Sequence, residues 1–350
     1  MPYGIYRLGR IRPGTGRHTY CGMYTTLKSG LDDILRPIAA HLERVDAAIG
    51  EQLRTGVPLI DESSIHLFTD KGKMIRASLI ILASGMRGRI PEGIIDIAAA
   101  AEIVHAATLI HDDIIDNAEM RRGDVAVSRR WGNKVAVLVG DHMYTRALEV
   151  AVRDDNYDLF PELVRATADM VKGELLQIEY SNMERITAER YFEIIELKTA
   201  RFLGACAKLG AIKAGLPAAE ADALKRFGVH LGFAFQIVDD TLDCIGDERS
   251  TGKDSGNDYL DAKATLPLIN ALEAASGPGR DELVRMCAQP APEHWPAVRE
   301  AIRVSGALAR CLDIAREYAR RAVGEIDGFP DSECKRIILR LSDFLLERAY

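Results

Sequence analysis

The pattern Asp-Asp-x-x-Asp occurs twice in the chain, as DDIID at 112–116 and as DDTLD at 239–243. Each copy follows an apolar segment with helical periodicity, and side chains four positions apart lie on one face of a helix. Each copy therefore presents two or three carboxylates to one point. A solvated acidic helix face would explain a single copy, but both copies are embedded in apolar sequence, where unpaired carboxylates are costly.

Two such clusters facing each other across a cavity would bring six aspartates together. Like charges repel, and burial removes the hydration that stabilises them. Mg²⁺ fits this composition best, because it is a hard cation that binds carboxylates together with substrate phosphates. The two clusters therefore predict a magnesium-dependent site for a phosphorylated substrate.

The composition predicts an all-α fold. Of the 350 residues, 47% are hydrophobic but only 6% are aromatic, which suits helices better than a β-sandwich. The net charge of −7 argues against nucleic-acid binding through bulk charge. The six cysteines show neither CxxC nor zinc-finger spacing and indicate a reduced, cytoplasmic protein. No apolar run approaches the roughly 20 residues of a membrane span, so we expect no transmembrane segment.

Helical periodicity dominates the chain, without alternating strand patterns or β-hairpin dipeptides. Clusters of Pro, Gly and Asp separate the helical segments, and one helical domain over 27–350 is the simplest arrangement. Residues 1–26 are rich in arginine and lack the apolar segment of a signal peptide, so we expect a disordered N-terminal extension. The expected helices cover 27–54, 73–88, 92–115, 133–153, 159–183, 188–214, 218–246, 264–274, 295–304, 306–325 and 331–347.

Basic residues surround the acidic clusters and predict binding of anionic groups. Lys73 and Arg76 lie three positions apart at the start of a helix, an arrangement that suits a diphosphate, although a solvated basic turn is the alternative. His105 precedes Asp112 by two helical turns and so points to the same side, although a lone histidine is more often a core residue. The other candidates are Arg121, Arg122, Lys198, Thr199, Lys253 and Lys263.

These residues can hold two anionic groups, one through metal and one directly through Lys and Arg. The combination suggests ionisation of an allylic diphosphate, with metal and cations stabilising the departing group. The sequence contains no GxSxG or CxxC signature and no GxxxxGK[ST] loop, so neither a nucleophilic mechanism nor a nucleotide substrate is indicated.

From Leu31 to the C-terminus, the chain resembles the trans-isoprenyl diphosphate synthases. GKMIRA at 72–77 is similar to the family's GKxxRP, with Ala77 in place of the usual proline. EIVHAATLIHDDIID at 102–116, followed by RRG, looks like the first aspartate-rich motif. Further family-like segments are WGNKVAVLVGD at 131–141, GELLQ at 173–177, KTA at 198–200, FQIVDD at 235–240 and KATLP at 263–267.

The resemblance implies a helical bundle around a central cavity, usually a homodimer, with three Mg²⁺ ions for which Mn²⁺ can substitute. It also implies ionisation, attack by the isopentenyl double bond, and loss of a proton to the leaving diphosphate. Asp112, Asp116 and Asp239 would ligate Mg²⁺, with Asp113, Asp240 and Asp243 supporting them. Lys73, Arg76, His105 and Arg122 would bind isopentenyl diphosphate, whereas Arg121, Lys198, Thr199, Gln236, Lys253 and Lys263 would hold the allylic diphosphate. The catalytic set would be Asp112, Asp113, Asp116, Lys198, Asp239, Asp240 and Lys253.

Product length should depend on the depth of the apolar cavity below the first motif. Ala107 and Thr108 lie five and four residues before Asp112, about one helical turn deeper. Short-chain members of the family often carry bulky aromatics there, so these small residues predict a product longer than geranylgeranyl diphosphate. We expect an octaprenyl or solanesyl type of enzyme serving quinone side chains. A higher floor could instead come from Met143, Tyr144, Leu163 or Met170.

Three alternatives remain open at this point. A short-chain farnesyl or geranylgeranyl diphosphate synthase would catalyse the same reaction but stop at a shorter product. A class I terpene cyclase also uses DDxxD and Mg²⁺, but it would not need Lys73 and Arg76 for a second diphosphate. A non-catalytic synthase subunit usually loses one aspartate motif, and both motifs are complete here.

Overall fold

Long helices lying side by side make up most of the structure, a computed structural model that describes residues 30–68, 72–153, 157–180, 186–245 and 256–347. Within these ranges one two-stranded hairpin is the only sheet, so the all-α prediction is confirmed. The helices are η1 Arg36–Ile38, α2 Ala39–Leu53, α3 Pro58–His66, α4 Ile75–Ser84, α5 Ile94–Ile115, α6 Val127–Trp131, α7 Asn133–Arg153, α8 Leu159–Glu179, α9 Ala188–Ile195, η2 Glu196–Ala200, α10 Arg201–Lys213, α11 Ala218–Ile245, α13 Asn257–Leu260, α14 Leu266–Ala274, α15 Gly277–Ala288, α16 Trp295–Val304, α17 Ala307–Ile326 and α18 Glu333–Glu347, and the strands are β1 Met120–Arg121 and β2 Asp124–Val125.

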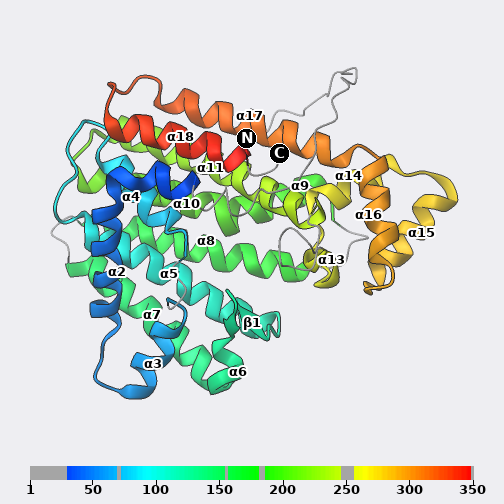
Figure 1. The fold of residues 1–350 in the computed structure, drawn as a ribbon, viewed down its shortest axis with the longest axis horizontal. Helices are drawn as coiled ribbons and strands as arrows, with labels where there is room; N and C mark the ends of the chain where they lie inside the picture. Colours follow the sequence, from blue (N-terminus) through cyan, green and yellow to red (C-terminus); the bar gives the residue numbers. More distant parts are fainter. Residues whose placement is uncertain (1–29, 69–71, 154–156, 181–185, 246–255, 348–350) are drawn as a thin grey trace.

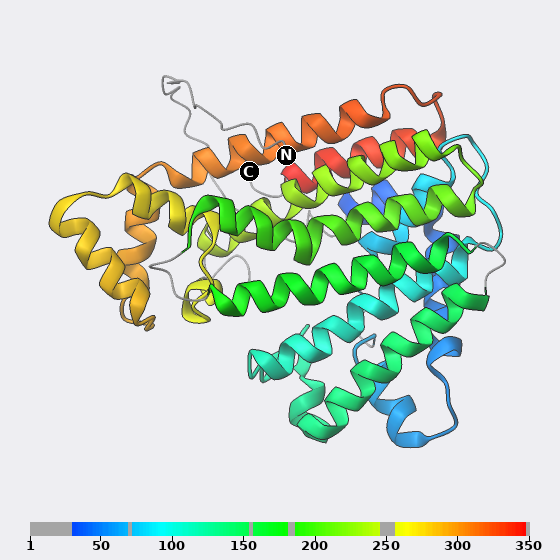
Figure 2. The ribbon, with the colours of Figure 1, turned by 180° about the vertical axis from the view of Figure 1, so that it is seen from behind.

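The two aspartate motifs end the two helices around which the others pack. α11 carries the second motif and packs against α10 and α17, whereas α5 carries the first and packs against α7, α4 and α2 (Figures 1 and 2). The main core joins residues of these helices, and a smaller core lies within the lobe of α13 to α16. This packing brings two segments more than a hundred residues apart to the same region.

α5 is apolar on all sides because it is buried on most sides. Alanines at 98–101, 106 and 107 are at most 4% exposed, and such small side chains let neighbouring helices approach closely. Among the described helices, α5 alone is long and apolar enough to cross a membrane, contrary to the expectation that no apolar run has that length. Since 72% of its most apolar window is buried inside the protein, it is a core helix here.

The helices α3, α6, α13 and α15 and the hairpin were not expected from the sequence. α3 and α15 begin at segments that were interpreted as separators, with Pro58 and Pro278 in their first turns. Proline is tolerated there because the N–H that it lacks would have no acceptor within the helix. In the hairpin, Met120 pairs with Val125 and Arg121 with Asp124. Arg122 and Gly123 close it with φ values of 53° and 81°, the left-handed geometry that suits a two-residue turn.

Gly210 permits the contact between α10 and α4. An added Cβ at Gly210 would collide with the backbone carbonyl oxygen of Ile80, which cannot move independently of its helix. We expect Gly210→Ala to lower the free energy of unfolding by about 1–3 kcal/mol through overpacking. The matched control is Gly50→Ala in α2, where an added Cβ meets no atom within 4 Å. It should raise stability by about 0.5–1 kcal/mol, because alanine restricts the unfolded chain. Urea denaturation would measure both, and equal effects would refute the packing argument.

Candidate active site

A cavity of about 220 Å³ lies where α5, α8, α11 and the segments around η2 and α13 meet. Asp116 lines it from the first motif and Asp240 from the second, together with Lys198, Thr199 and Gln236. The structure therefore brings the two motifs to one cavity, as the sequence analysis predicted. The apolar part of its lining is formed by Ile115, Ile178, Tyr180, Ile186, Ile194, Ile195, Ala262 and Ala264.

The first motif ends α5 and is compensated by one cation from the hairpin that follows it and one from a distant segment. Asp113 is fully buried and accepts a hydrogen bond of 2.7 Å from Arg121 Nε, while its Oδ2 has no hydrogen-bond partner. Asp116 accepts a hydrogen bond of 2.9 Å from Lys263 Nζ. Burial raises the pKa of Asp112 to about 6, although the nearby Lys198 opposes the shift. These carboxylates are thus short of positive charge.

The second motif is held by a chain of hydrogen bonds at the end of α11. Asp240, 5% exposed, accepts hydrogen bonds from Tyr191 Oη at 2.6 Å and Gln236 Nε2 at 2.8 Å. Gln236 Oε1 in turn accepts one of 2.9 Å from Thr199 Oγ1. Burial raises the pKa of Asp240 in spite of these bonds. Asp243 accepts from the backbone N–H of Asp258 at 3.2 Å, and burial raises its pKa as well.

A π-helical turn, η2, presents Lys198 and Thr199 to the cavity. The sequence predicted one continuous helix over 188–214, whereas η2 interrupts it at Glu196–Ala200. The π-helical turn packs against two glycines of neighbouring helices. A Cβ added to Gly173 would lie 2.6 Å from the backbone nitrogen of Lys198, and one added to Gly232 would lie 2.5 Å from the Cα of Ala200. Such π-helical turns widen a helix locally and often occur at functional sites.

A second basic group lies around the start of α4. Arg76 stacks over the Phe202 ring at 5.8 Å, and its Nε is buried without a hydrogen-bond partner. Burial, followed by the charges of Arg76, Arg122 and Arg121, lowers the pKa of His105 well below its usual value, so this histidine is neutral at pH 7. Arg122 Nη1 donates a hydrogen bond of 3.4 Å to the Leu67 carbonyl. Lys73 precedes α4 and is exposed.

Several lining residues were missed by the sequence analysis. Glu174 forms an ion pair with Lys198, and Gln177 Oε1 accepts a hydrogen bond of 3.4 Å from the same lysine. Asp258 within α13 and Asp261 at its end also line the cavity. The family-like GELLQ segment could have indicated Glu174 and Gln177, but no local pattern marks Tyr191 or Asp258. Lys253 lies outside the described residues, as do residues 1–26.

Of the two predicted chain-length residues, Ala107 lies inside the main core and Thr108 is half-buried. Ala107 is completely buried, and Thr108 Oγ1 donates a hydrogen bond of 2.7 Å to the His105 carbonyl of its own helix. Met143, Leu163 and Met170 belong to the same core cluster as Ala107. Tyr144 lies closer to the first motif, since the Asp112 charge adds to burial in raising its pKa.

The carboxylate oxygens suit a hard divalent cation. Within the described ranges, no three His, Cys, Asp or Glu side chains converge closely enough to enclose an ion by themselves. Mg²⁺ characteristically binds through one or two carboxylates plus substrate phosphates rather than in an all-protein cage. The undercompensated charges of Asp112 and Asp240 and the unpartnered Oδ2 of Asp113 therefore fit ions that arrive with a diphosphate.

Comparison with known proteins agrees with this geometry. A sequence model described as polyprenyl synthetase matches residues 57–304. The chain is 34% identical to an all-trans-nonaprenyl-diphosphate synthase of Rhodobacter capsulatus, over 90% of this chain and 97% of that protein. It is 35% identical to a short chain isoprenyl diphosphate synthase of Methanothermobacter thermautotrophicus, over 91% of this chain and 98% of that protein.

Comparison with solved structures identifies the same family. A crystal structure of a polyprenyl synthase from Caulobacter crescentus, complexed with calcium and isoprenyl diphosphate, superimposes with a TM-score of 0.86. That protein is 34% identical, and the match covers 91% of this chain and 98% of the other. The resemblance noted from the motifs is confirmed: the chain belongs to the polyprenyl synthetase family and is a prenyltransferase.

Proposed function

We propose that the protein condenses isopentenyl diphosphate with an allylic diphosphate to make a long-chain all-trans polyprenyl diphosphate. The observation that carries the proposal is the single cavity lined by both aspartate motifs and by Lys198, Thr199 and Lys263. The separate basic group at Arg76, His105 and Arg122 supplies a place for a second diphosphate. A cyclase with one diphosphate substrate would leave that second group unexplained.

The allylic diphosphate would lie in the cavity. Lys198 and Lys263 supply positive charge, and the Thr199 hydroxyl can donate a hydrogen bond once a ligand replaces its contact with Gln236 Oε1. Gln236 Nε2, which donates one hydrogen bond to Asp240, has a second N–H for the ligand. Arg121 would contribute from the hairpin, and Lys253 remains a candidate from outside the described residues. When the C–O bond breaks, the electron pair stays on the diphosphate, where these groups stabilise the developing charge.

Isopentenyl diphosphate would bind at the start of α4. Lys73, Arg76 and Arg122 provide charge for its diphosphate, and the neutral His105 can donate one hydrogen bond. The isopentenyl double bond then forms the new C–C bond to the allylic carbon. A proton leaves the resulting cation for an oxygen of the departed diphosphate, which completes the balance of atoms and charge.

Mg²⁺ would be held by Asp112, Asp116 and Asp239, with Asp113, Asp240 and Asp243 in support. Bound there, it would neutralise charge on the allylic diphosphate. Three ions per site, replaceable by Mn²⁺, are proposed from the family resemblance. The calcium in the related Caulobacter crescentus structure supports a divalent cation.

Measuring the KM for each substrate separately in single variants tests the two binding regions. Arg76→Ala should raise the KM for isopentenyl diphosphate about tenfold or more, because a charged hydrogen-bond partner is lost. Lys198→Ala should do the same for the allylic diphosphate. The control is Arg285→Ala, which removes an exposed pair with Glu282 on α15 and should change neither value. If Arg76→Ala raised only the KM for the allylic substrate, the assignment would be reversed.

A long-chain product is supported by the small, buried Ala107 and by the octaprenyl and nonaprenyl synthases among the relatives. Purified protein given Mg²⁺, labelled isopentenyl diphosphate and farnesyl diphosphate should give products that end at or beyond heptaprenyl, and chelation by EDTA should stop incorporation. Ala107→Tyr should end the ladder earlier by placing a bulky ring about one turn below the first motif, whereas Ala107→Ser should leave the product length unchanged. A wild-type ladder ending at geranylgeranyl would favour the short-chain alternative, and no incorporation would favour a cyclase or a partner-dependent subunit.

We also propose that the protein is a homodimer that associates through α7 and α8. On α8, Val171, Leu175 and Ile178 form a stripe at helical spacing that is 48–62% exposed, and Leu138 on the adjacent α7 is 68% exposed. Contiguous exposed apolar side chains mark association surfaces. Cytoplasmic location also remains a proposal, which cell fractionation would test.

The dimer proposal predicts that charge within this stripe separates the subunits. The double variant Leu138→Glu/Leu175→Glu should sediment as a monomer where the wild type sediments as a dimer, because two buried carboxylates would oppose association. Val304→Glu on α16 is the control, since that residue is similarly exposed, at 65%, but lies outside the stripe. A wild type that sediments as a monomer at micromolar concentration would rule the proposal out.

A further inference from the structure

The first turn of α4, which carries Arg76, has no local cap. The residue before the helix, Met74, is in the left-handed region with φ 45° and ψ 39°, and its side chain makes no capping hydrogen bond. Helices normally need such a partner, because their first N–H groups have no acceptor within the helix. The backbone N–H of Ala77 in particular requires an acceptor from the protein, because this residue is fully buried and water cannot reach it.

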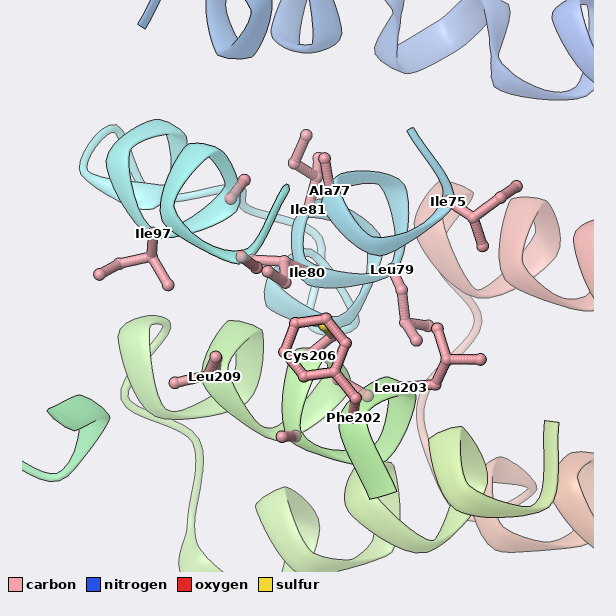
Figure 3. Close-up of a cluster of buried hydrophobic side chains, with 14 of the residues drawn as sticks. Ile75, Ala77, Leu79, Ile80, Ile81, Ile97, Phe202, Leu203, Cys206 and Leu209 are labelled. Carbon is pink, nitrogen blue, oxygen red and sulfur yellow. The ribbon is translucent and has the colours of Figure 1, made fainter. Parts of the chain in front are cut away.

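Glu102 of α5 supplies the missing acceptor from another helix. Its carboxylate is buried at 8% exposure, and Oε1 accepts a hydrogen bond of 2.9 Å from the Ala77 N–H. A negative charge at a helix N-terminus is also favoured by the helix dipole. Figure 3 shows the surroundings: α4 with Ala77 packs beside α5, which carries Ile97, and against α10, which carries Phe202.

The same bond fixes the relation between two members of the basic group. Arg76 is the chain neighbour of Ala77, and His105 lies one turn after Glu102 on α5. The attraction of the Glu102 charge also favours the charged form of the half-buried Arg76, whose guanidinium lies over the Phe202 ring. One carboxylate thus sets the position of the Arg76 turn relative to His105.

We propose that Glu102 is a positioning residue for isopentenyl diphosphate: by satisfying the buried Ala77 N–H it keeps the first turn of α4 formed, with Arg76 beside His105. The inference rests on the proposed function for the role of Arg76. It assigns Glu102 no contact with substrate.

Position 77 offers an unusually direct test, because the donor in this bond is a backbone N–H. Removing Glu102 alone leaves a buried donor unsatisfied, whereas removing both partners of a buried hydrogen bond can be nearly neutral. Proline at 77 removes the donor, and its ring is tolerated in the first turn of a helix, where it also stiffens the backbone. Ala77→Pro should therefore rescue a Glu102 variant rather than add to its defect.

The experiment compares steady-state kinetics of five proteins. Glu102→Ala should raise the KM for isopentenyl diphosphate about tenfold, or about 1.4 kcal/mol, with the KM for farnesyl diphosphate unchanged. Glu102→Gln, whose amide oxygen can still accept from Ala77, and the double variant Glu102→Ala/Ala77→Pro should both stay within about threefold of the wild type. The control is Glu162→Ala, which removes an equally buried carboxylate that pairs with Lys225 at the far end of α8. It should lower stability without changing either KM.

Hydrogen exchange of residues 75–78 gives a readout that does not depend on activity. Glu102→Ala should speed amide exchange in this turn, and the double variant should restore slow exchange for the amides that remain. A double variant with a tenfold raised KM would overturn the proposal, as would a Glu102→Gln variant as impaired as Glu102→Ala. If Glu102→Ala does not fold, the double variant and Glu102→Gln still decide the question. An inactive wild type would refute the proposed function, while the exchange data would still test the bond.

Discussion

The repulsion between carboxylates at the ends of α5 and α11 is the constraint on which the rest of the site depends. The two helices meet at one cavity, so their aspartates need hydrogen bonds and positive charges from other segments to offset the repulsion. Arg121 reaches Asp113 from the hairpin, Lys263 reaches Asp116 from 147 residues away, and Tyr191 donates to Asp240. Each of these partners comes from a different segment, so the site forms only when the whole bundle does.

The partners neutralise the negative charge of the aspartates only in part. The remaining negative charge favours the binding of metal cations together with a diphosphate substrate. Burial still raises the pKa of Asp112 and Asp240, and one oxygen of Asp113 has no partner. An arrangement of this kind binds cations that a diphosphate brings with it. In the second basic group, the positive charges of Arg76 and Arg122 lie near a neutral His105. Such a group can bind a second anion directly, without a metal ion. The two substrates would thus be distinguished by how their charge is neutralised.

The sequence predicted the long helices and most of the site, because both depend on local periodicity and on motifs. It missed α3 and α15, where a proline begins a helix instead of separating two. It also missed the hairpin, whose strands are too short to show an alternating pattern. The predicted roles of all the site residues stay predictions, since no bound ligand tests them. The alanine at position 77 supplies a buried hydrogen-bond donor that a proline would lack.

By itself, the sequence determined the fold class, the family and the residues that carry charge at the site. These follow from composition, helical spacing and contiguous motifs, which are properties of short segments. Only the tertiary structure decided which cation pairs with which aspartate, that a π turn between Gly173 and Gly232 presents Lys198, and that Glu102 caps α4. Apart from the Arg121–Asp113 pair, which spans 8 residues, those contacts join positions 25 to 147 residues apart, and such distances are set by the packing of helices rather than by any local pattern.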